Sequence, residues 1–432
     1  MLVASLNTRA VLGMDSPNVV VEVHASNGLP SFSIVGLPEA SVKESRDRVR
    51  SALISSGFKL PPKRITVNLA PADLPKTGGR YDLPIAIGIL LATEQLQLED
   101  VQQFELFGEL ALTGELRRIH GAIASLLASH SASKNIILPY DNIHEAKLLV
   151  ATYPELADKL FLVKDLREAC QVLMNQQMLH PVDITSLQAA DGFQMGYLED
   201  LADVRGQSQA KRALEIAASG HHSMMMIGPP GAGKSMLASR LITLLPELTA
   251  QEAIEAANIR SIAGEVITQE SFYERPFIHP HHTASAASMV GGGSNPKPGA
   301  LSLAHHGVLF LDELPEFNRA VLEALREPLE TKSVNISRVN QHVNYPANSL
   351  LITAMNPSPS GFFPDDPLGR CKDTPDQILR YQKKISGPLL DRIDLHIEVP
   401  AVDIMDLQNS SQPNNEEPSV KVRERVTVVR QA

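Results

Sequence analysis

The first part of the chain alternates short apolar runs with segments of helical spacing. Val19 to Val23 and Ser31 to Val35 predict strands, because β-branched runs and period-two alternation suit a sheet. Glu39 to Ser56 repeats apolar residues every three or four positions, which is the spacing of an amphipathic helix. The same patterns predict strands at Ile65–Leu69, Phe104–Leu110 and Asn135–Leu138 and helices at Pro84–Thr93 and Ala122–His130. Residues 1–170 are therefore expected to form a mixed α+β domain.

The pattern changes after residue 170. Residues 171–195 contain five glutamines and no hydrophobic period, which predicts a linker. Residues 196–402 predict a second domain of the α/β class, and residues 403–432 predict a mobile polar loop followed by the start of a helix. The elements expected in the second domain are strands at Ser223–Ile227, Val308–Leu311 and Ser349–Met355, a helix at Met236–Leu245 and a β-hairpin within 332–345.

Composition and charge narrow the class of protein. The chain has 432 residues, of which 43% are apolar and 20% charged, as in soluble globular proteins. A net charge of −10 excludes a uniformly basic nucleic-acid coat protein and leaves room for a local basic groove. The two cysteines, Cys170 and Cys371, are too few for a disulfide scaffold or a four-thiolate zinc site. The longest apolar run, Leu83 to Ala92, is half the length of a membrane span, and no secretory signal precedes it, so a cytoplasmic protein without a membrane partner is expected.

A glycine-rich loop predicts a nucleotide site. Residues 228–235 fit the pattern G-x-x-x-x-G-K-[ST] and lie between a predicted strand and a predicted helix. Glycines let backbone N–H groups turn toward phosphate oxygens, Lys234 would reach the β- and γ-phosphates, and Ser235 would bind Mg²⁺. The alternative is a glycine-rich helix entry without a ligand. The residues expected to bind the nucleotide here are Gly228, Pro229, Pro230, Gly231, Ala232, Gly233, Lys234, Ser235 and Met236.

Two carboxylates end a later apolar strand. Asp312 and Glu313 follow Val308–Leu311, and Asp312 comes 78 residues after Lys234. Asp312 would complete the Mg²⁺ site, and Glu313 would orient and deprotonate the attacking water. An apolar run before Asp-Glu is common at ordinary strand ends, so the prediction depends on its combination with the glycine-rich loop.

Two further polar residues have positions that suit hydrolysis. Asn356 ends the strand Ser349–Met355 and would contact the γ-phosphate or the water; taken alone, Asn356 with Pro357 would be a turn. Arg392 would stabilise transition-state charge on the nucleotide of a neighbouring subunit. Its alternative is a surface salt bridge with Asp391 or Asp394.

These four elements, in this order, resemble the AAA+ ATPases. Val204-Arg205-Gly206-Gln207 resembles the adenine-side segment of that superfamily, which adds Val204 and Arg205 to the expected nucleotide contacts. Segments 281–285, 291–294, 299–307 and 386–394 resemble magnesium-chelatase-type members. Gly36-Leu37-Pro38 and the segment 76–86 resemble the N-terminal domain of the ComM (YifB) family.

The resemblance implies a hexameric homo-oligomeric ring that uses ATP and Mg²⁺ to move DNA, associated with branch migration in natural transformation and recombination. It implies an N-terminal Lon-protease-like (ribosomal S5 domain 2-like) α+β domain followed by a P-loop AAA+ α/β domain with a parallel central sheet. Segments 76–81 and 122–125 lack the serine and the lysine of the Lon dyad, so covalent catalysis is not expected. The family carries cysteines after the Asn-Pro pair, where this chain has Ser358-Pro359-Ser360-Gly361, and it continues into a helical lid that this chain, ending at Ala432, is expected to contain only in part.

Two loops are candidates for DNA contact. One carries Asn295 and Lys297 within a glycine-rich stretch, and the other carries Lys332 and Arg338 within the predicted hairpin. The alternative for both is a solvated loop. The histidines at 279, 281, 282, 305 and 306 match no standard zinc spacing, and packing and hydrogen bonding are expected of them.

An ATP-driven DNA-remodelling motor is therefore the leading hypothesis. A magnesium-chelatase-like ATPase for metal insertion is the alternative, and an ATP-dependent protease is a third that the missing dyad opposes.

Overall fold

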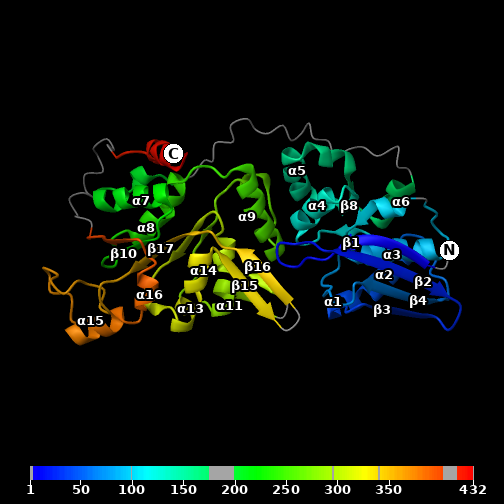
Figure 1. Cartoon of the computed structure of the whole chain (residues 1–432), viewed down its shortest axis with the longest axis horizontal. Helices are drawn as coiled ribbons and strands as arrows, with labels where there is room; N and C mark the ends of the chain where they lie inside the picture. The colour runs from blue at the N-terminus through cyan, green and yellow to red at the C-terminus, as the bar shows by residue number, and fades with distance from the viewer. Residues whose placement is uncertain are drawn as a thin grey trace. The chain divides into compact units, whose positions relative to one another are not determined.

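The structure, a computed structural model, describes residues 3–98, 100–174, 199–293, 296–338, 341–401 and 416–431. The chain divides into two compact units (Figure 1). Unit 1 comprises residues 1–193 and 257–272, and unit 2 comprises residues 194–256 and 273–432. Most of the predicted linker and of the predicted mobile loop lies outside the described residues.

Unit 1 is built on a seven-stranded mixed sheet in the order β3-β4-β2-β1-β5-β8-β9. The β1–β2 and β2–β4 pairs are antiparallel, and the other neighbouring strands pair in parallel. The strands are β1 (Val3–Arg9), β2 (Asn18–Ser26), β3 (Ser31–Val35), β4 (Arg64–Ala70), β5 (Phe104–Leu106), β8 (Asn135–Pro139) and β9 (Leu160–Val163), with the small pair β6 (Glu109–Leu110) and β7 (Leu116–Arg117) beside them. The helices are α1 (Ala40–Lys43), α2 (Ser45–Ser55), α3 (Asp82–Ala92), α4 (Ala122–Ser131), α5 (Ile143–Thr152), α6 (Leu166–Met174) and α10 (Gln269–Phe272).

Helix α3 forms the centre of the unit 1 core. Ten of its eleven residues are buried, and it packs on β1 and β2. Gly88 is required at that contact, since a Cβ there would lie 2.5 Å from a Val23 methyl group. A helix buried on all sides reads as a continuous apolar run, as the sequence predicted for this segment.

Two predicted elements of unit 1 are interrupted. The predicted strand Phe104–Leu110 is wrong in its middle, because the N–H of Gly108 bonds the Arg80 carbonyl and its own carbonyl accepts from Leu83. The predicted helix Glu39–Ser56 is divided into α1 and α2 at Glu44.

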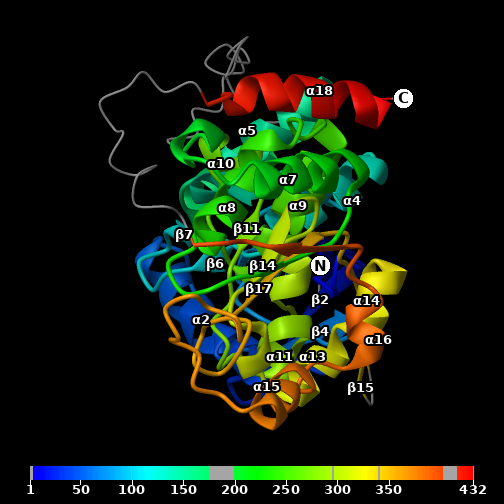
Figure 2. The same cartoon turned by 90° about the vertical axis from the view of Figure 1, so that its left-hand side faces the viewer.

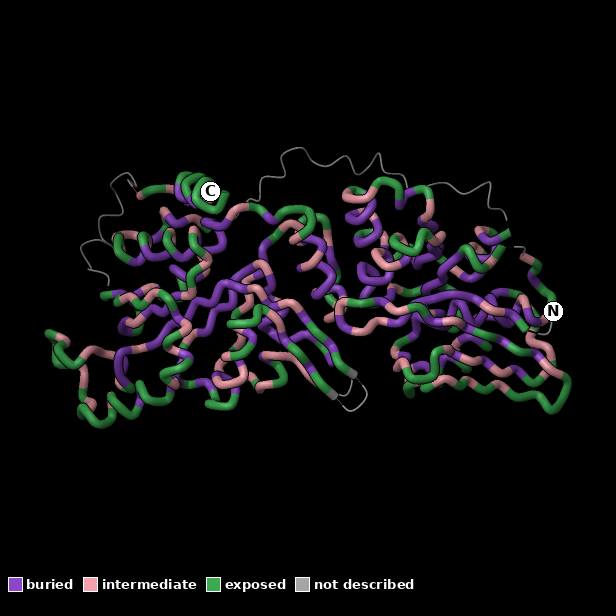
Figure 3. The backbone as a smooth tube through the Cα atoms, viewed as in Figure 1, coloured by how far each residue is buried: buried purple, intermediate pink, exposed green. Residues whose placement is uncertain are grey.

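Unit 2 contains a five-stranded sheet in the order β11-β14-β17-β10-β18, parallel throughout. Its strands are β10 (Met224–Ile227), β11 (Phe277–Ile278), β14 (Val308–Leu311), β17 (Leu350–Met355) and β18 (Leu395–Glu398). β14 and β17 are buried along their whole length (Figure 3), as expected of strands covered on both faces. Because all five strands run the same way, their carboxyl ends share one edge of the sheet.

Helices and two small hairpins surround this sheet. The helices are α7 (Ser208–Gly220), α8 (Lys234–Arg240), α9 (Ala250–Ala263, whose end belongs to unit 1), α11 (Ala286–Val290), α12 (Ala300–Leu303), α13 (Arg319–Ala324), α14 (Arg326–Thr331), α15 (Pro375–Gln382), α16 (Gly387–Leu390) and α18 (Ser419–Gln431). β15 (Ser333–Arg338) pairs with β16 (Gln341–Pro346), which confirms the predicted hairpin, and β12 (Gly291–Gly292) pairs with β13 (Lys297–Pro298). α18 lies along α7 (Figure 2), with Val422 and Val426 buried in the core.

No helix of the described segments is both long and apolar enough to cross a membrane.

Candidate functional site: a nucleotide loop at the carboxyl edge of the sheet

The glycine-rich loop connects β10 to α8 at the carboxyl edge of the unit 2 sheet. The N–H of Gly228 donates to the Met355 carbonyl of β17, and a Cβ at Gly228 would lie 2.2 Å from the Val399 oxygen. Gly231 and Gly233 have φ of +78° and +85°, values that favour glycine, and nothing lies within 4 Å of a Cβ added to either. The loop is therefore held close to the sheet at its start and open at the turn into the helix.

Lys234 is held by neutral acceptors. The side chain is only 8% exposed, and Nζ donates to the carbonyls of Gly228 at 2.7 Å and Pro229 at 3.0 Å and to Asn356 Oδ1 at 3.2 Å. Burial lowers the pKa of Lys234, while the charges of Asp312 and Glu313 act in the opposite direction. A buried ammonium with neutral partners suits a site whose ligand supplies negative charge.

Ser235 and Asp312 come together at the same edge. Ser235 Oγ donates to Asp312 Oδ2 at 2.7 Å, and Asp312 Oδ1 accepts the Glu313 N–H at 2.9 Å. Hydroxyl and carboxylate oxygens are the ligands that Mg²⁺ prefers. The residues present thus fit a magnesium nucleotide, with Ser235 and Asp312 toward the metal and Lys234 toward the phosphates.

Glu313 is held by a histidine. Its backbone is left-handed, with φ +53° and ψ +46°, and its half-exposed carboxylate lies 3.1 Å from His282 Nδ1. His282 follows β11, the strand next to β14, so the ends of adjacent strands bring the pair together. The sequence predicted packing and hydrogen bonding for His282 but not its contact with Glu313.

Asn356 is positioned from two sides. Its Oδ1 accepts from Lys234, and its backbone lies beside the phenol of Tyr381 on α15. Tyr381 is buried, which raises its pKa to about 12. Sequence reasoning did not identify Tyr381.

Arg392 contacts residues other than those of the glycine-rich loop. It donates to the Pro388 carbonyl at 2.5 Å and pairs with Glu330 of α14. The alternative considered for Arg392, a salt bridge to Asp391 or Asp394, is wrong in its partner, because Asp394 instead accepts from Ser223 and lies 3.4 Å from His222.

The expected adenine-side segment is fastened to the start of α18. Val204 is buried and Arg205 half-buried, and the N–H of the next residue, Gly206, donates to Glu416 at 3.0 Å. Glu416 also pairs with Lys211 of α7. Ser419 Oγ accepts the Leu201 N–H at 2.7 Å, while the Ser419 N–H donates to Asp200 at 2.9 Å.

Two further residues, Gln207 and Met236, belong to the segments expected to lie beside the nucleotide. Gln207 donates to the Pro400 carbonyl at 2.8 Å and to the Ala232 carbonyl at 3.4 Å, so it joins the segment to the glycine-rich loop. Met236, on the first turn of α8, is 38% exposed.

The two candidate DNA loops lie side by side. Tyr345 of β16 is buried and donates to the Pro296 carbonyl at 2.9 Å, which ties the β15–β16 hairpin to the segment before β13. Lys297 and Lys332 are exposed. Asn295 and the side chain of Arg338 lie outside the described part of the chain.

His305 and His306 both lie within hydrogen-bonding distance of Glu255. His305 Nδ1 accepts the Asn348 N–H at 3.0 Å, so its proton lies on Nε2, 3.4 Å from Glu255. Burial lowers the pKa of His305 to about 4. A neutral ring with both nitrogens engaged acts as a hydrogen-bonding core residue, in agreement with the packing role expected from the sequence.

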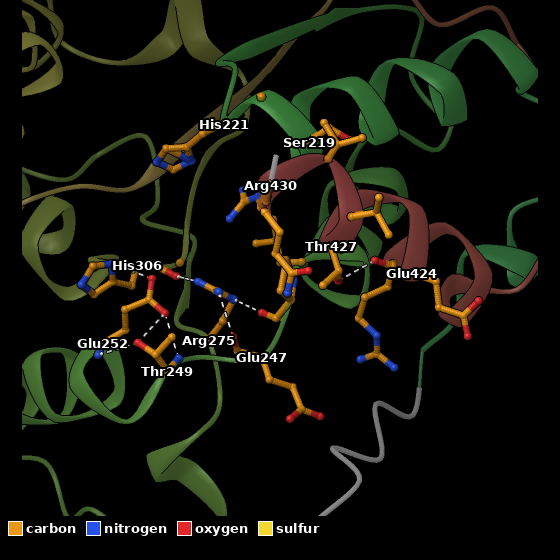
Figure 4. A pocket seen from close by; sticks show the side chains of 18 of the residues that line it. Ser219, His221, Glu247, Thr249, Glu252, Arg275, His306, Glu424, Thr427 and Arg430 are labelled. Atoms are coloured by element: carbon orange, nitrogen blue, oxygen red, sulfur yellow. Dashed lines mark hydrogen bonds and ion pairs between the residues drawn. The ribbon is translucent and has the colours of Figure 1, made fainter.

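A cavity of about 1150 Å³ lies at the other edge of the sheet (Figure 4). His221, His306 and Asn348, which precede β10, β14 and β17, line it together with α18. Arg275 in its wall donates to three backbone carbonyls, those of Pro246, Glu247 and His306. The cavity is thus separate from the nucleotide loop, which lies at the carboxyl ends of the same strands.

Comparison with known proteins finds family matches in both units. Residues 200–407 match the family described as magnesium chelatase, subunit ChlI, and residues 21–142 match that described as subunit ChlI of Mg-chelatase. Competence protein ComM of Haemophilus influenzae and YifB of Escherichia coli are each 48% identical over 431 residues, covering 100% of this chain and 82% of those proteins. DNA replication licensing factor mcm6 of Dictyostelium discoideum is 26% identical over 196 residues, covering 45% of this chain and 19% of that protein.

Proposed function

The chain belongs to the ComM/YifB family of magnesium-chelatase-like proteins, whose AAA+ relationship indicates an ATPase, and from this we propose that it is an ATP-driven ring motor that remodels DNA. Branch migration in natural transformation and recombination is the activity we assign to it. The observation that carries the ATPase part is the meeting of Lys234, Ser235, Asp312 and Asn356 at one sheet edge.

The proposed reaction is in-line attack of water on the γ-phosphate. Lys234 exchanges its carbonyl partners for phosphate oxygens, and Glu313 leaves His282 to orient and deprotonate the water. Mg²⁺, when bound by Ser235 and Asp312, neutralises phosphate charge. Asn356 contacts the γ-phosphate or the water.

The ring part of the proposal concerns Arg392. We assign it to the nucleotide of a neighbouring subunit in a hexamer, where it would stabilise transition-state charge. Its pairing with Glu330, away from the loop of its own unit, supports an action across an interface, and that pair must open in the ring.

Unit 1 is proposed to be a Lon-protease-like domain without the protease dyad. In the segment where that family has its nucleophile, this chain has Arg80, which is buried and donates to Ser125 Oγ at 3.0 Å. An arginine offers no nucleophile for covalent catalysis, which supports a domain without the dyad.

DNA is proposed to contact the joined hairpins through Asn295, Lys297, Lys332 and Arg338. The exposed lysines and the similarity to competence protein ComM support this assignment. Contacts to phosphates suit a motor that moves along any sequence.

The test is ATP turnover with and without forked DNA, at low and physiological salt. Glu313→Gln should leave ATP binding intact and lower turnover at least a hundredfold, because it removes the general base. Glu327→Gln, an exposed carboxylate on α14, is the matched control and should behave as wild type. Unchanged turnover in Glu313→Gln would contradict the assignment.

DNA dependence separates the motor from its alternative. Strong stimulation that weakens with salt supports the motor. The family descriptions name magnesium chelatase, so turnover that ignores DNA and responds to a porphyrin-binding partner would favour metal insertion.

A further inference from the structure

Unit 1 has a pocket of its own beside the edge strand of its sheet. The pocket encloses about 440 Å³, between α2, β3 and the segment that leads into β4. That volume is within the range of ligand sites. Its walls are apolar at Phe32, Leu60 and Ile65, and Arg46, Arg50 and Lys63 supply its cations.

Positive charge is concentrated around this pocket. Residues 39–64 carry seven lysines and arginines against three acidic residues, a net charge of +4 in a chain whose net charge is −10. One of the seven has a structural role: Arg48 binds both oxygens of buried Asp82, at 2.7 and 3.1 Å. The other six are exposed or half-exposed, namely Lys43, Arg46, Arg50, Lys59, Lys63 and Arg64.

Asp47, the acidic residue that lines the pocket, forms an ion pair with Arg46 alone among the three cations there. Asp47 pairs with its neighbour Arg46 at 3.2 Å, and their side chains are 69% and 53% exposed. An exposed pair of this kind is weak, so a phosphate can replace the carboxylate at Arg46. Arg50, one helical turn after Arg46, and Lys63 line the same pocket.

The apolar wall adds a second kind of contact. Phe32 alternates inward on β3 and remains half-buried, with Ile65 as its register partner on β4. A flat aromatic ring among cations suits a nucleic-acid base, because the base stacks while the cations meet its phosphates.

We propose that this pocket binds single-stranded DNA, with a base against Phe32 and backbone phosphates at Arg46, Arg50 and Lys63. The inference rests on the proposed function, since it supplies a second grip for the same DNA, apart from the hairpins of unit 2. Lys43, Lys59 and Arg64 extend the positive charge beyond the pocket, which favours a polyanion over a single nucleotide.

The test measures binding of fluorescently labelled oligothymidine to the full chain by anisotropy, without ATP and over a range of salt concentrations. Arg50→Gln with Lys63→Gln removes two phosphate contacts. The slope of log K against log salt should become shallower by about 1.4, and binding at 0.1 M salt should weaken roughly 25-fold. The matched control, Arg117→Gln with Lys372→Gln, removes the same charge from exposed residues outside the pocket and should bind as wild type.

Phe32→Leu tests the stacking contact separately. It keeps an apolar side chain, so the unit should fold, and it should weaken binding at least fivefold without changing the salt slope. A thermal unfolding midpoint equal to that of wild type confirms that each variant folds.

Three results would overturn the proposal. Wild-type affinity and slope in the Arg50/Lys63 variant would remove the pocket from DNA binding, and the proposed function would stand if DNA still stimulates ATP turnover. No binding of DNA to the wild-type chain, together with turnover indifferent to DNA, would overturn both. Displacement of the oligonucleotide by thymidine monophosphate at an equal phosphate concentration would assign the pocket to a free nucleotide.

Discussion

The contacts of Lys234 predict how Lys234→Met changes the free energy of unfolding in the absence of nucleotide. The change removes an ammonium that is 8% exposed and bound by three neutral acceptors. The loss of three hydrogen bonds destabilises the folded state by about 1 kcal/mol each. The variant also no longer buries a charge that has no carboxylate in contact, which stabilises the folded state by several kcal/mol. The two terms oppose each other, so the free energy of unfolding without nucleotide should change by less than about 2 kcal/mol.

The response to ATP should change far more. A ligand at a hundred times its Kd stabilises the folded state by about 2.7 kcal/mol. For a unit of the length of unit 2, each kcal/mol moves the Tm by about 2 to 4 °C, so wild type should gain about 5 to 11 °C. Lys234→Met, which cannot neutralise the phosphates, should lose most of that gain.

The assay is thermal unfolding of the full chain with and without ATP and Mg²⁺. Lys372→Met, a change at an exposed lysine of unit 2, is the control and should keep the wild-type gain. A full ATP-dependent gain in Lys234→Met would refute the assignment of Lys234. A fall in Tm without nucleotide as large as the ATP gain would refute the argument from charge burial.

Two further predictions concern stability and packing. The pKa of His305 is lowered from 6.5 to about 4 in the folded protein, so the unfolded chain binds a proton at this histidine more tightly. The contribution of His305 to stability is therefore present above pH 6.5 and is lost as the pH falls toward 4. Urea unfolding should lose about 2 kcal/mol between pH 7 and pH 5 through this group, and His305→Gln should remove that loss; equal pH dependence in both proteins would contradict it. Gly228→Ala places a methyl group 2.2 Å from the Val399 oxygen, which should cost about 1 to 3 kcal/mol in the free energy of unfolding and at least tenfold in ATP affinity by titration calorimetry. Gly387→Ala, with open space around its Cβ, should do neither.

The nucleotide edge was predictable because its signals are local. The glycines, Lys234 and Ser235 are consecutive, and Asp312 and Asn356 each end an apolar strand. Parallel strands then bring their carboxyl ends to one edge, so identifying the strands was enough to predict that these residues meet. The predicted hairpin within 332–345 succeeded for the same reason, because alternation is visible in adjacent residues.

The remaining features depend on partners distant in sequence. Arg392 has acidic neighbours on both sides, yet it pairs with Glu330, 62 positions away, which the local pattern does not show. The contact between His282 and Glu313 requires knowing that β11 and β14 are neighbours. Segment 257–272 groups with unit 1 although it lies between two parts of unit 2, and its local sequence pattern does not say which core it joins.

The fastening of the expected adenine-side segment to Glu416 and the start of α18 has a consequence for synthesis. Gly206 and Glu416 are 210 positions apart, so a growing chain exposes the segment long before its partner is made. At ordinary elongation speeds this interval is roughly 10 to 40 seconds. Once residue 356 has been made, the ribosome-bound chain contains the glycine-rich loop, Asp312 and Asn356 but still lacks Glu416 and Ser419. In a nascent chain, the residues proposed to hold the phosphates are therefore complete before the wall proposed to lie beside the base closes.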